Sequence, residues 1–535
     1  MLMEDMRRLA AGTTLEADLA IVGTGPAGLS IARAFFGTDV RVVLLESGGV
    51  GEAPEVAPSE TFENAGAPRF MNPRRVRNRC VGGSSQTWSG RCRTFDAIDF
   101  EPRSWVPHSG WPISKEDLAP YEERAAEAMH LGPNIYDGRL WPLLGHGEPG
   151  IAPAPDLLEP CFWQFSRDPG QPAEFLRFGP QFLGLRADNV RVLTNATVTH
   201  IDTDESGRIT SLELASAPGH VCRLRPKIAV LAAGGIENTR LLLLSNRQRP
   251  AGLGNGNDLV GRYLMDHPRT TVGEFTGPAV EAIQTRLGLY QFRQAGKASF
   301  YAPGVRLSPE LQRKEQMLNC AAYLSEDRSA DDPWDAINRL RSGQSENRAK
   351  DMMRAMSSPG RLLEGLYQRQ VNGRNVSHKL DRLVVDCLVE QVPDPDSRLT
   401  LSEKTDELGQ PLPRIFWKVS ELEKRSVATL ARTFAREFAR LGLKPPALQE
   451  WIARDRPQDA VFTDAAHPTG TTRMSHDPKT GVVDADCRLH EARGLYITGS
   501  SVFPTASHAN PTLMIVAMAL RLADLIKQRH FGLTC

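Results

Sequence analysis

Residues 18–28 read DLAIVGTGPAG, an apolar run of strand length followed by three glycines, Gly23, Gly25 and Gly28. Residues 29–36 then have the composition of a helix, and a second apolar run, 40–45, ends at Glu46. A strand, a helix and a strand within about thirty residues are typical of a βαβ unit that binds a dinucleotide. The sequence therefore predicts an α/β fold whose nucleotide site lies near the amino terminus.

The three glycines answer three needs of such a site: a tight turn, close approach of the backbone to a pyrophosphate, and close packing of helix on strand. The helix that starts near Pro26 and Ala27 directs free N–H groups and a partial positive charge at the phosphates. Glu46 and Ser47 end the second strand, where a carboxylate can accept hydrogen bonds from the ribose hydroxyls. An ordinary glycine turn is the alternative, and these residues alone do not distinguish FAD from NAD.

Charge and composition exclude several other classes. The chain has 535 residues with 64 basic and 64 acidic side chains, so nothing in its charge indicates binding to nucleic acid. Its start has no apolar stretch long enough for a signal peptide, and no segment reads as a membrane span. The eight cysteines are scattered singly without a CxxC pair, which gives no support for a metal site. This usage favours a reducing, cytoplasmic location, with export alongside a partner as the alternative.

The chain is long enough for more than one lobe. Nucleotide-binding signals occur near both ends, including strand-like residues 228–233 and 495–498, whereas the middle is more polar. We therefore expect a second lobe inserted into the first. The expected ranges are 1–115, 190–270 and 455–535 for the nucleotide-binding domain, and 116–189 and 271–454 for the substrate-binding domain.

Four segments together resemble the glucose–methanol–choline (GMC) oxidoreductase family. They are the βαβ unit, RCVGGSS at 79–85, AAGGIENTRLL at 232–242 with VGRYLMDHP at 260–268, and the block from HPTGTTRM at 467–474 to ANPTL at 509–513. They occur in family order and span nearly the whole chain. The resemblance implies an FAD-binding Rossmann-like domain of the GMC type, with an inserted α+β substrate domain built on an antiparallel sheet.

The resemblance also implies which residues contact FAD. Val198 resembles the residue that places backbone groups on the adenine, although a plain core valine is an alternative. The expected cofactor-binding residues are Gly23, Gly25, Pro26, Ala27, Gly28, Glu46, Ser47, Arg79, Gly82, Gly83, Ser84, Thr87, Val198, Ala233, Gly234, Gly499, Ser500, Asn510, Pro511 and Thr512.

Some members of the family bind the flavin covalently through a histidine in the glycine loop. By an ungapped count from Gly82-Gly83, the corresponding position here is Thr87, and a shift of one residue gives Gln86. Neither side chain has a ring nitrogen, so we expect FAD to be non-covalently bound.

The resemblance places His467 and Asn510 beside the flavin. Oxidation of an alcohol needs a base for the hydroxyl proton, which suits a histidine, and a donor that orients the substrate oxygen, which suits an amide. Asn510 precedes Pro511, a favourable first residue for the helix that follows. His508 is a possible pocket residue that could share the role of base.

Two further side chains, His267 and Arg473, receive other interpretations. His267, within MDHP, matches a family motif that we interpret as structural. Arg473 is expected to support its loop rather than contact substrate.

Motif style is closest to the sugar-oxidising members, such as pyranose oxidase and fructose dehydrogenase. We therefore expect oxidation of a CH–OH group of a sugar, glycoside or polyol, with Trp88, Trp105 and Trp111 as candidates for stacking on a sugar ring. The electron acceptor is left open between oxygen and a quinone-like molecule. Alternatives are a lyase in which FAD is structural, an oxidase of a non-sugar alcohol, an NAD-dependent dehydrogenase, and a flavin-loaded binding protein without turnover.

Overall fold

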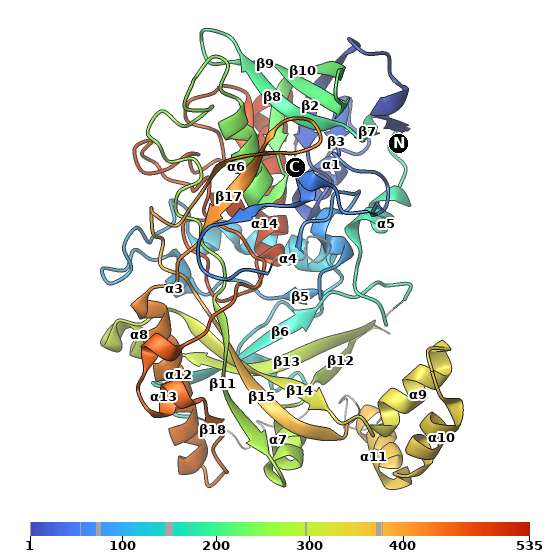
Figure 1. Cartoon of the computed structure of the whole chain (residues 1–535), viewed down its shortest axis with the longest axis vertical. Coiled ribbons are helices and arrows are strands. Elements are labelled where there is room, and N and C mark those ends of the chain that lie inside the picture. Colours follow the sequence, from blue (N-terminus) through green and yellow to red (C-terminus); the bar gives the residue numbers. More distant parts are fainter. Residues whose placement is uncertain are drawn as a thin grey trace.

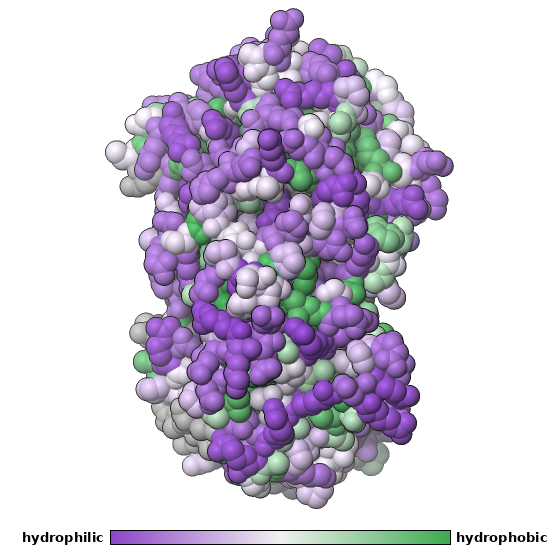
Figure 2. Space-filling model, turned by 90° about the vertical axis from the view of Figure 1, so that its left-hand side faces the viewer, coloured by the Kyte–Doolittle hydropathy of each residue, from purple (hydrophilic) through white to green (hydrophobic). Residues whose placement is uncertain are grey.

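The computed structural model of the chain describes residues 2–53, 55–70, 76–144, 153–171, 173–294, 297–370, 376 and 378–534. The chain forms two lobes that follow one another along its longest axis (Figure 1). Each lobe has its own large sheet and its own buried apolar cluster. Figure 2 shows an outline that narrows between the lobes, with hydrophobic residues gathered near the middle of a mainly hydrophilic face.

The upper lobe is built on an eight-stranded sheet in the order β1-β7-β3-β2-β10-β9-β8, with β19 also paired to β10. Neighbours from β1 to β10, and β19 on β10, run parallel, whereas β8, β9 and β10 pair antiparallel. The strands are β1 (Leu2–Asp5), β2 (Thr14–Val22), β3 (Val42–Leu45), β7 (Val190–Thr194), β8 (Thr197–Thr203), β9 (Ile209–Ala217), β10 (His220–Leu231) and β19 (Leu495–Ile497). This confirms the predicted Rossmann-like sheet.

The order of the strands explains the sequence pattern. The second half of β2 is buried at every position because β3 and β10 flank it and helices cover its faces. Helix α1 (Pro26–Ala34) follows β2 directly and packs against α14 (Thr512–Ile526), which also contacts α4 (Lys115–Ala128). Helix α14 is buried on most of its circumference because it lies inside this layer, as its apolar sequence predicts.

The lower lobe contains an antiparallel sheet in the order β18-β11-β15-β14-β13-β6-β5, with β12 on β13. Its strands are β5 (Arg91–Cys92), β6 (Leu158–Phe165), β11 (Arg269–Thr276), β12 (Tyr290–Gln294), β13 (Lys297–Leu307), β14 (Cys320–Arg328), β15 (Leu380–Val389) and β18 (Ala447–Leu448). Helix α12 (Glu421–Arg440) packs its apolar face on β11, β14 and β15. The inserted α+β domain is thereby confirmed as a fold class.

Several contacts cross the expected domain ranges. Helix α4 lies within 116–189 for most of its length yet packs on α14 of the upper lobe. A small sheet of β4 (Glu63–Asn64), β16 (Arg398–Thr405) and β17 (Pro411–Phe416) packs on α6 (Gly234–Leu244), although β16 and β17 fall within 271–454. The division of the chain into two domains by residue range stays a prediction, and α4, β16 and β17 are the segments at which it needs testing.

The other helices are α3 (Ala97–Phe100), α5 (Phe178–Leu183), α7 (Ala279–Leu287), α8 (Pro309–Glu315), α9 (Pro333–Ser342), α10 (Arg348–Met356), α11 (Pro359–Gln370) and α13 (Glu450–Ala453). Among the described residues, no helix has both the length and the apolar character that crossing a bilayer requires.

Replacing Gly28 by alanine should destabilise the βαβ unit. A Cβ at this position would lie 2.0 Å from the Gly23 carbonyl oxygen and 3.3 Å from Ile21 Cγ2, so helix and strand would have to separate. We expect Gly28→Ala to lower the free energy of unfolding by about 1–3 kcal/mol. Chemical denaturation measures this change. Gly360→Ala is the matched control because a Cβ there meets open space within helix α11, and an equal loss in both variants would contradict the packing argument.

Candidate active site and cofactor cavity

A cavity of about 590 Å³ lies at the carboxyl ends of β2, β3 and β10, where open α/β sheets bind their ligands. Val22, Leu45 and Ala232 mark these strand ends in its lining. Arg91 of β5 and Arg269 of β11 also line it, so the cavity extends to the sheet of the lower lobe.

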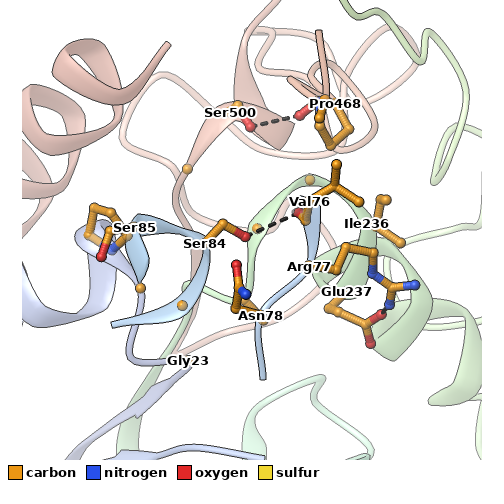
Figure 3. A pocket seen from close by; sticks show the side chains of 18 of the residues that line it. Gly23, Val76, Arg77, Asn78, Ser84, Ser85, Ile236, Glu237, Pro468 and Ser500 are labelled. Atoms are coloured by element: carbon orange, nitrogen blue, oxygen red, sulfur yellow. Dashed lines mark hydrogen bonds and ion pairs between the residues drawn. The ribbon is translucent and has the colours of Figure 1, made fainter. Parts of the chain in front are cut away.

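Loops from distant parts of the chain form the wall shown in Figure 3. Ser84 Oγ donates to the Val76 carbonyl at 3.1 Å, and Ser500 Oγ donates to the Pro468 carbonyl at 2.7 Å. Arg77 forms an ion pair with Glu237 at the start of α6. The Arg77–Glu237 ion pair joins two chain segments that are 160 residues apart, whereas each of the two serine hydrogen bonds connects neighbouring parts of one region.

Three glycines in the lining have a backbone that faces open space. A Cβ built on Gly25, Gly234 or Gly499 would meet no atom within 4 Å, although all three residues line the cavity. Gly234 and Gly499 also have φ values of +85° and +102°, which favour glycine. The bare backbone leaves room for a flat or diphosphate group to approach, which fits the glycine pattern predicted from sequence.

Two helices begin at the cavity without side-chain caps. The N-cap of helix α1 is Gly25 and that of α14 is Pro511, so neither helix has a side-chain hydrogen bond at its N-cap. The first N–H groups of a helix attract negative charge. One end suits a pyrophosphate and the other suits the negative charge of a reduced flavin, so the wall fits FAD at two separate points.

Glu46 is 5% exposed and lines the same cavity. Its Oε1 accepts from the Gly48 N–H at 2.9 Å, and its Oε2 accepts from the Thr24 N–H at 3.3 Å and from the Thr24 hydroxyl. Burial raises the pKa of the Glu46 carboxyl, while these hydrogen bonds oppose the rise. The side chain is therefore held in one position at the strand end, where a ribose can contact it.

The structure brings nearly all the expected cofactor residues to this one cavity. Its lining includes Gly23, Gly25, Pro26, Ala27, Glu46, Ser47, Arg79, Gly83, Ser84, Thr87, Val198, Ala233, Gly234, Gly499, Ser500, Asn510, Pro511 and Thr512. Gly28 and Gly82 are absent from the lining. Gly28 packs on Gly23, and Gly82 has a φ of +103° and packs against Gly179. Both glycines therefore allow close packing of the backbone and do not face the cavity.

His467 and Asn510 meet at the cavity wall, forty-three residues apart in sequence. The Asn510 Nδ2 atom lies 3.5 Å from His467 Nε2, and both residues line the cavity. Asn510 Oδ1 is buried and has no hydrogen-bond partner among the described residues. One imidazole nitrogen and one carboxamide therefore converge on the same point.

His267 contacts His467 directly, which the structural interpretation of MDHP did not include. The two Nδ1 atoms are 2.8 Å apart, and His267 Nε2 lies 3.0 Å from the Ala506 carbonyl oxygen. A carbonyl oxygen accepts only, so His267 Nε2 carries the proton in the neutral ring and Nδ1 is its acceptor. His467 Nδ1–H then donates to His267, and the lone pair of His467 Nε2 is left facing Asn510.

Electrostatics keep both rings neutral. Burial, followed by the neighbouring His267, lowers the pKa of His467 to about 3, and burial lowers the pKa of His267. The lone pair on His467 Nε2 is therefore available across the physiological pH range. The proton positions inferred from hydrogen bonding and from charge agree.

Asp266 anchors the loop that carries His467. Its fully buried carboxylate accepts from the backbone N–H groups of Ala465, His467 and His267 at 2.8–3.0 Å and forms an ion pair with Arg69 at 2.7 Å. Burial opposes its ionisation, yet Arg69 and the histidines keep the pKa of Asp266 below its usual value. This carboxylate fixes the backbone of both histidines.

His508 does not line the cavity. It is fully buried, its ring packs edge-on to Trp163 at 6.1 Å, and neither ring nitrogen has a hydrogen-bond partner among the described residues. Burial and Arg93 hold its pKa well below the usual value. Its predicted place in the pocket gains no support from this geometry.

The other singled-out side chains divide similarly. Trp88 lines the cavity, whereas Trp105 and Trp111 donate their indole N–H groups to Met317 and Thr505 outside it. Arg473 donates to the His108 carbonyl at 2.6 Å and does not line the cavity, as a loop-supporting role requires.

Sequence reasoning missed several lining residues, namely Arg69, Arg77, Asn78, Arg91, Glu237, Arg269 and Asp464. Glu237 lies in the first turn of α6, within the AAGGIENTRLL segment, whereas the others lie in loops or in strands without a local motif. An unpaired arginine cannot be recognised before its neighbours are known.

The residues of the cavity fit one class of protein, a dinucleotide-binding oxidoreductase, with a neutral histidine and an amide on the cavity wall. A family model described as GMC oxidoreductase matches residues 393–519. The chain is 28% identical to the fructose dehydrogenase large subunit of Gluconobacter japonicus over 96% of this chain and 98% of that protein. It is 23% identical to the 6'''-hydroxyparomomycin C oxidase of Streptomyces lividus over 95% of this chain and 91% of that protein.

Solved structures agree on the fold. The crystal structure of pyridoxine 4-oxidase from Mesorbium loti superposes with a TM-score of 0.55 at 16% identity, covering 96% of this chain and 100% of that one. The chain is thus similar to GMC oxidoreductases along nearly its whole length. It is an FAD-dependent oxidoreductase that acts on alcohols.

Proposed function

We propose that this enzyme oxidises a CH–OH group of a sugar, glycoside or polyol to a carbonyl, with His467 as the base and Asn510 as the group that orients the substrate oxygen. The observation that carries the proposal is the unprotonated His467 Nε2 facing the Asn510 amide at 3.5 Å on the cavity wall. When bound, FAD supplies the acceptor for the hydride that leaves the carbinol carbon.

A substrate hydroxyl placed between the two side chains can donate its proton to His467 Nε2 and accept from Asn510 Nδ2. As the C–H bond breaks, the oxygen gains alkoxide character, and a base and an oriented donor both lower that barrier. His467 must start neutral for this role, which its lowered pKa provides.

Three features support the finer assignments. Relatives whose names include fructose dehydrogenase and 6'''-hydroxyparomomycin C oxidase favour a sugar-like substrate, and Trp88 in the lining can stack on a ring. The seven described cysteines are free and buried, which favours the cytoplasm.

Oxygen and a quinone-like molecule are the two candidates for the electron acceptor.

Anaerobic mixing with a panel of sugars, glycosides, polyols and simple alcohols should bleach the flavin absorbance with at least one sugar-like member. His467→Ala should slow bleaching by about 10²- to 10⁴-fold, because it removes the base. Rapid-mixing spectroscopy measures both.

His490→Ala is the control, since His490 Nε2 donates to the Ser475 carbonyl away from the cavity and its loss should leave the rate unchanged. Turnover of a sugar without bleaching would favour a lyase, and bleaching only by non-sugar alcohols would reject the substrate class. Wild-type rates in His467→Ala would reject the assignment of the base.

His267→Phe should lower kcat by about 10- to 100-fold and leave KM nearly unchanged. The change removes the acceptor that holds the proton on His467 Nδ1, while His267 itself does not line the cavity. His267→Asn keeps an acceptor oxygen on a short side chain and should restore part of the rate. Steady-state kinetics with a check of flavin content measure the effect, and a change confined to KM would contradict a role in positioning.

Thr87 supports non-covalent FAD, because its hydroxyl donates to Asn78 Oδ1 at 2.7 Å and it has no nitrogen to bond the flavin. Acid precipitation should therefore leave a colourless pellet and a yellow supernatant. Flavin that stays with the pellet after acid and detergent would show a covalent link at another residue.

A further inference from the structure

Arg91 is a partly buried cation in the lining of the cavity. It lies on β5, the edge strand of the lower sheet, and lines the cavity together with His467. Its charge is one of the causes that lower the pKa of His467, so the two side chains share one end of the cavity.

Arg91 has no carboxylate partner within the part of the chain that the structure describes. The other arginines of the lining do: Arg69 pairs with Asp266 and Asp464, Arg77 and Arg79 pair with Glu237, and Arg269 pairs with Asp386. Arg91 therefore differs from the other lining arginines in having no ion pair, and it shares the cavity lining with His467, the proposed base.

Aromatic rings surround Arg91 instead of acids. Its guanidinium carbon lies 4.1 Å from the Tyr323 ring centroid, 4.9 Å from that of Trp163 and 5.9 Å from that of Phe165. Cation–π contacts and a hydrogen bond with the Tyr323 hydroxyl hold the side chain in place without forming an ion pair. Burial accordingly lowers the pKa of Arg91, although an arginine remains cationic at neutral pH.

A partly buried guanidinium group without a carboxylate partner favours binding of an anionic ligand, which supplies the missing opposite charge. The planar guanidinium matches carboxylate and phosphate oxygens in a two-point hydrogen bond. The pyrophosphate of FAD is not the natural partner, because the features that suit it lie at Gly25 and the start of α1.

We propose that Arg91 binds an anionic oxygen group of the substrate, so that the preferred alcohols are carboxylated or phosphorylated sugars or polyols. This inference rests on the proposed alcohol oxidation at His467 and narrows its substrate class. The anionic group pairs with Arg91 while the reacting hydroxyl meets His467 and Asn510.

The test compares matched probes on the FAD-loaded enzyme: glucose, glucuronate and glucose 6-phosphate, and glycerol, glycerate and glycerol 3-phosphate. Calorimetry measures binding, and anaerobic flavin bleaching measures the reaction. We expect at least one anionic probe to bind at least about tenfold more tightly than its neutral partner, and the carboxylate and phosphate members show which anion is preferred.

Arg91→Met should weaken binding of that anionic probe by about 100-fold and change binding of the neutral one little, since it removes the charge and keeps a long apolar side chain. Arg91→Lys should retain part of the preference. Arg167→Met is the matched control, because Arg167 also lies over aromatic rings, Phe175 at 4.3 Å and Phe300 at 5.4 Å, but outside the cavity lining.

The outcomes separate the two proposals. Anion binding that depends on Arg91 without bleaching would support the inference and count against the proposed oxidation of these compounds. Equal binding of neutral and anionic probes, absence of binding by every anionic probe, or anion binding that survives in Arg91→Met would overturn the inference. So would an equal loss of bleaching rate for neutral and anionic substrates in Arg91→Met, which would assign the charge to the flavin.

Discussion

The carbonyl oxygen of Ala506 determines where two protons sit. Because it can only accept, it requires a proton on His267 Nε2, which makes His267 Nδ1 an acceptor and places the proton of His467 on its own Nδ1. The lone pair of His467 Nε2 is the result, and the proposed chemistry depends on it. The Ala506 carbonyl thus sets which nitrogen of His467 carries the proton, although it contacts His467 only through His267.

This chain of contacts works only because the backbone around it is rigid. Asp266 holds the backbone N–H groups of both histidines, and Arg69 keeps Asp266 ionised in a buried setting. Removing water from the site strengthens each of these interactions and also lowers the pKa of His467. One desolvated cluster therefore provides both the geometry of His467 and its unprotonated state.

The division of labour between the lobes follows from the same geometry. The upper sheet supplies glycine turns and helix ends, which present backbone to a cofactor, whereas the lower sheet presents side chains such as Arg91 and Arg269 across the cavity. Backbone groups suit a constant cofactor, and side chains can vary with the substrate. In the lower sheet, aromatic rings hold the guanidinium group of Arg91 in place without an ion pair.

The amino-acid sequence by itself predicted the βαβ unit and the buried α14, because local periodicity and glycine spacing carry that information. The family resemblance in the sequence added many of the expected cofactor-binding residues on the cavity wall. Element limits were less certain: β10 begins at His220 rather than near residue 228, because its first half alternates polar and apolar residues where it pairs with β9. The contact of His267 with His467, the position of His508 outside the cavity and the isolation of Arg91 were decided only by the tertiary structure. Hydrogen-bond partners and counter-ions are set by which distant segments pack together, and no local pattern in the chain encodes that.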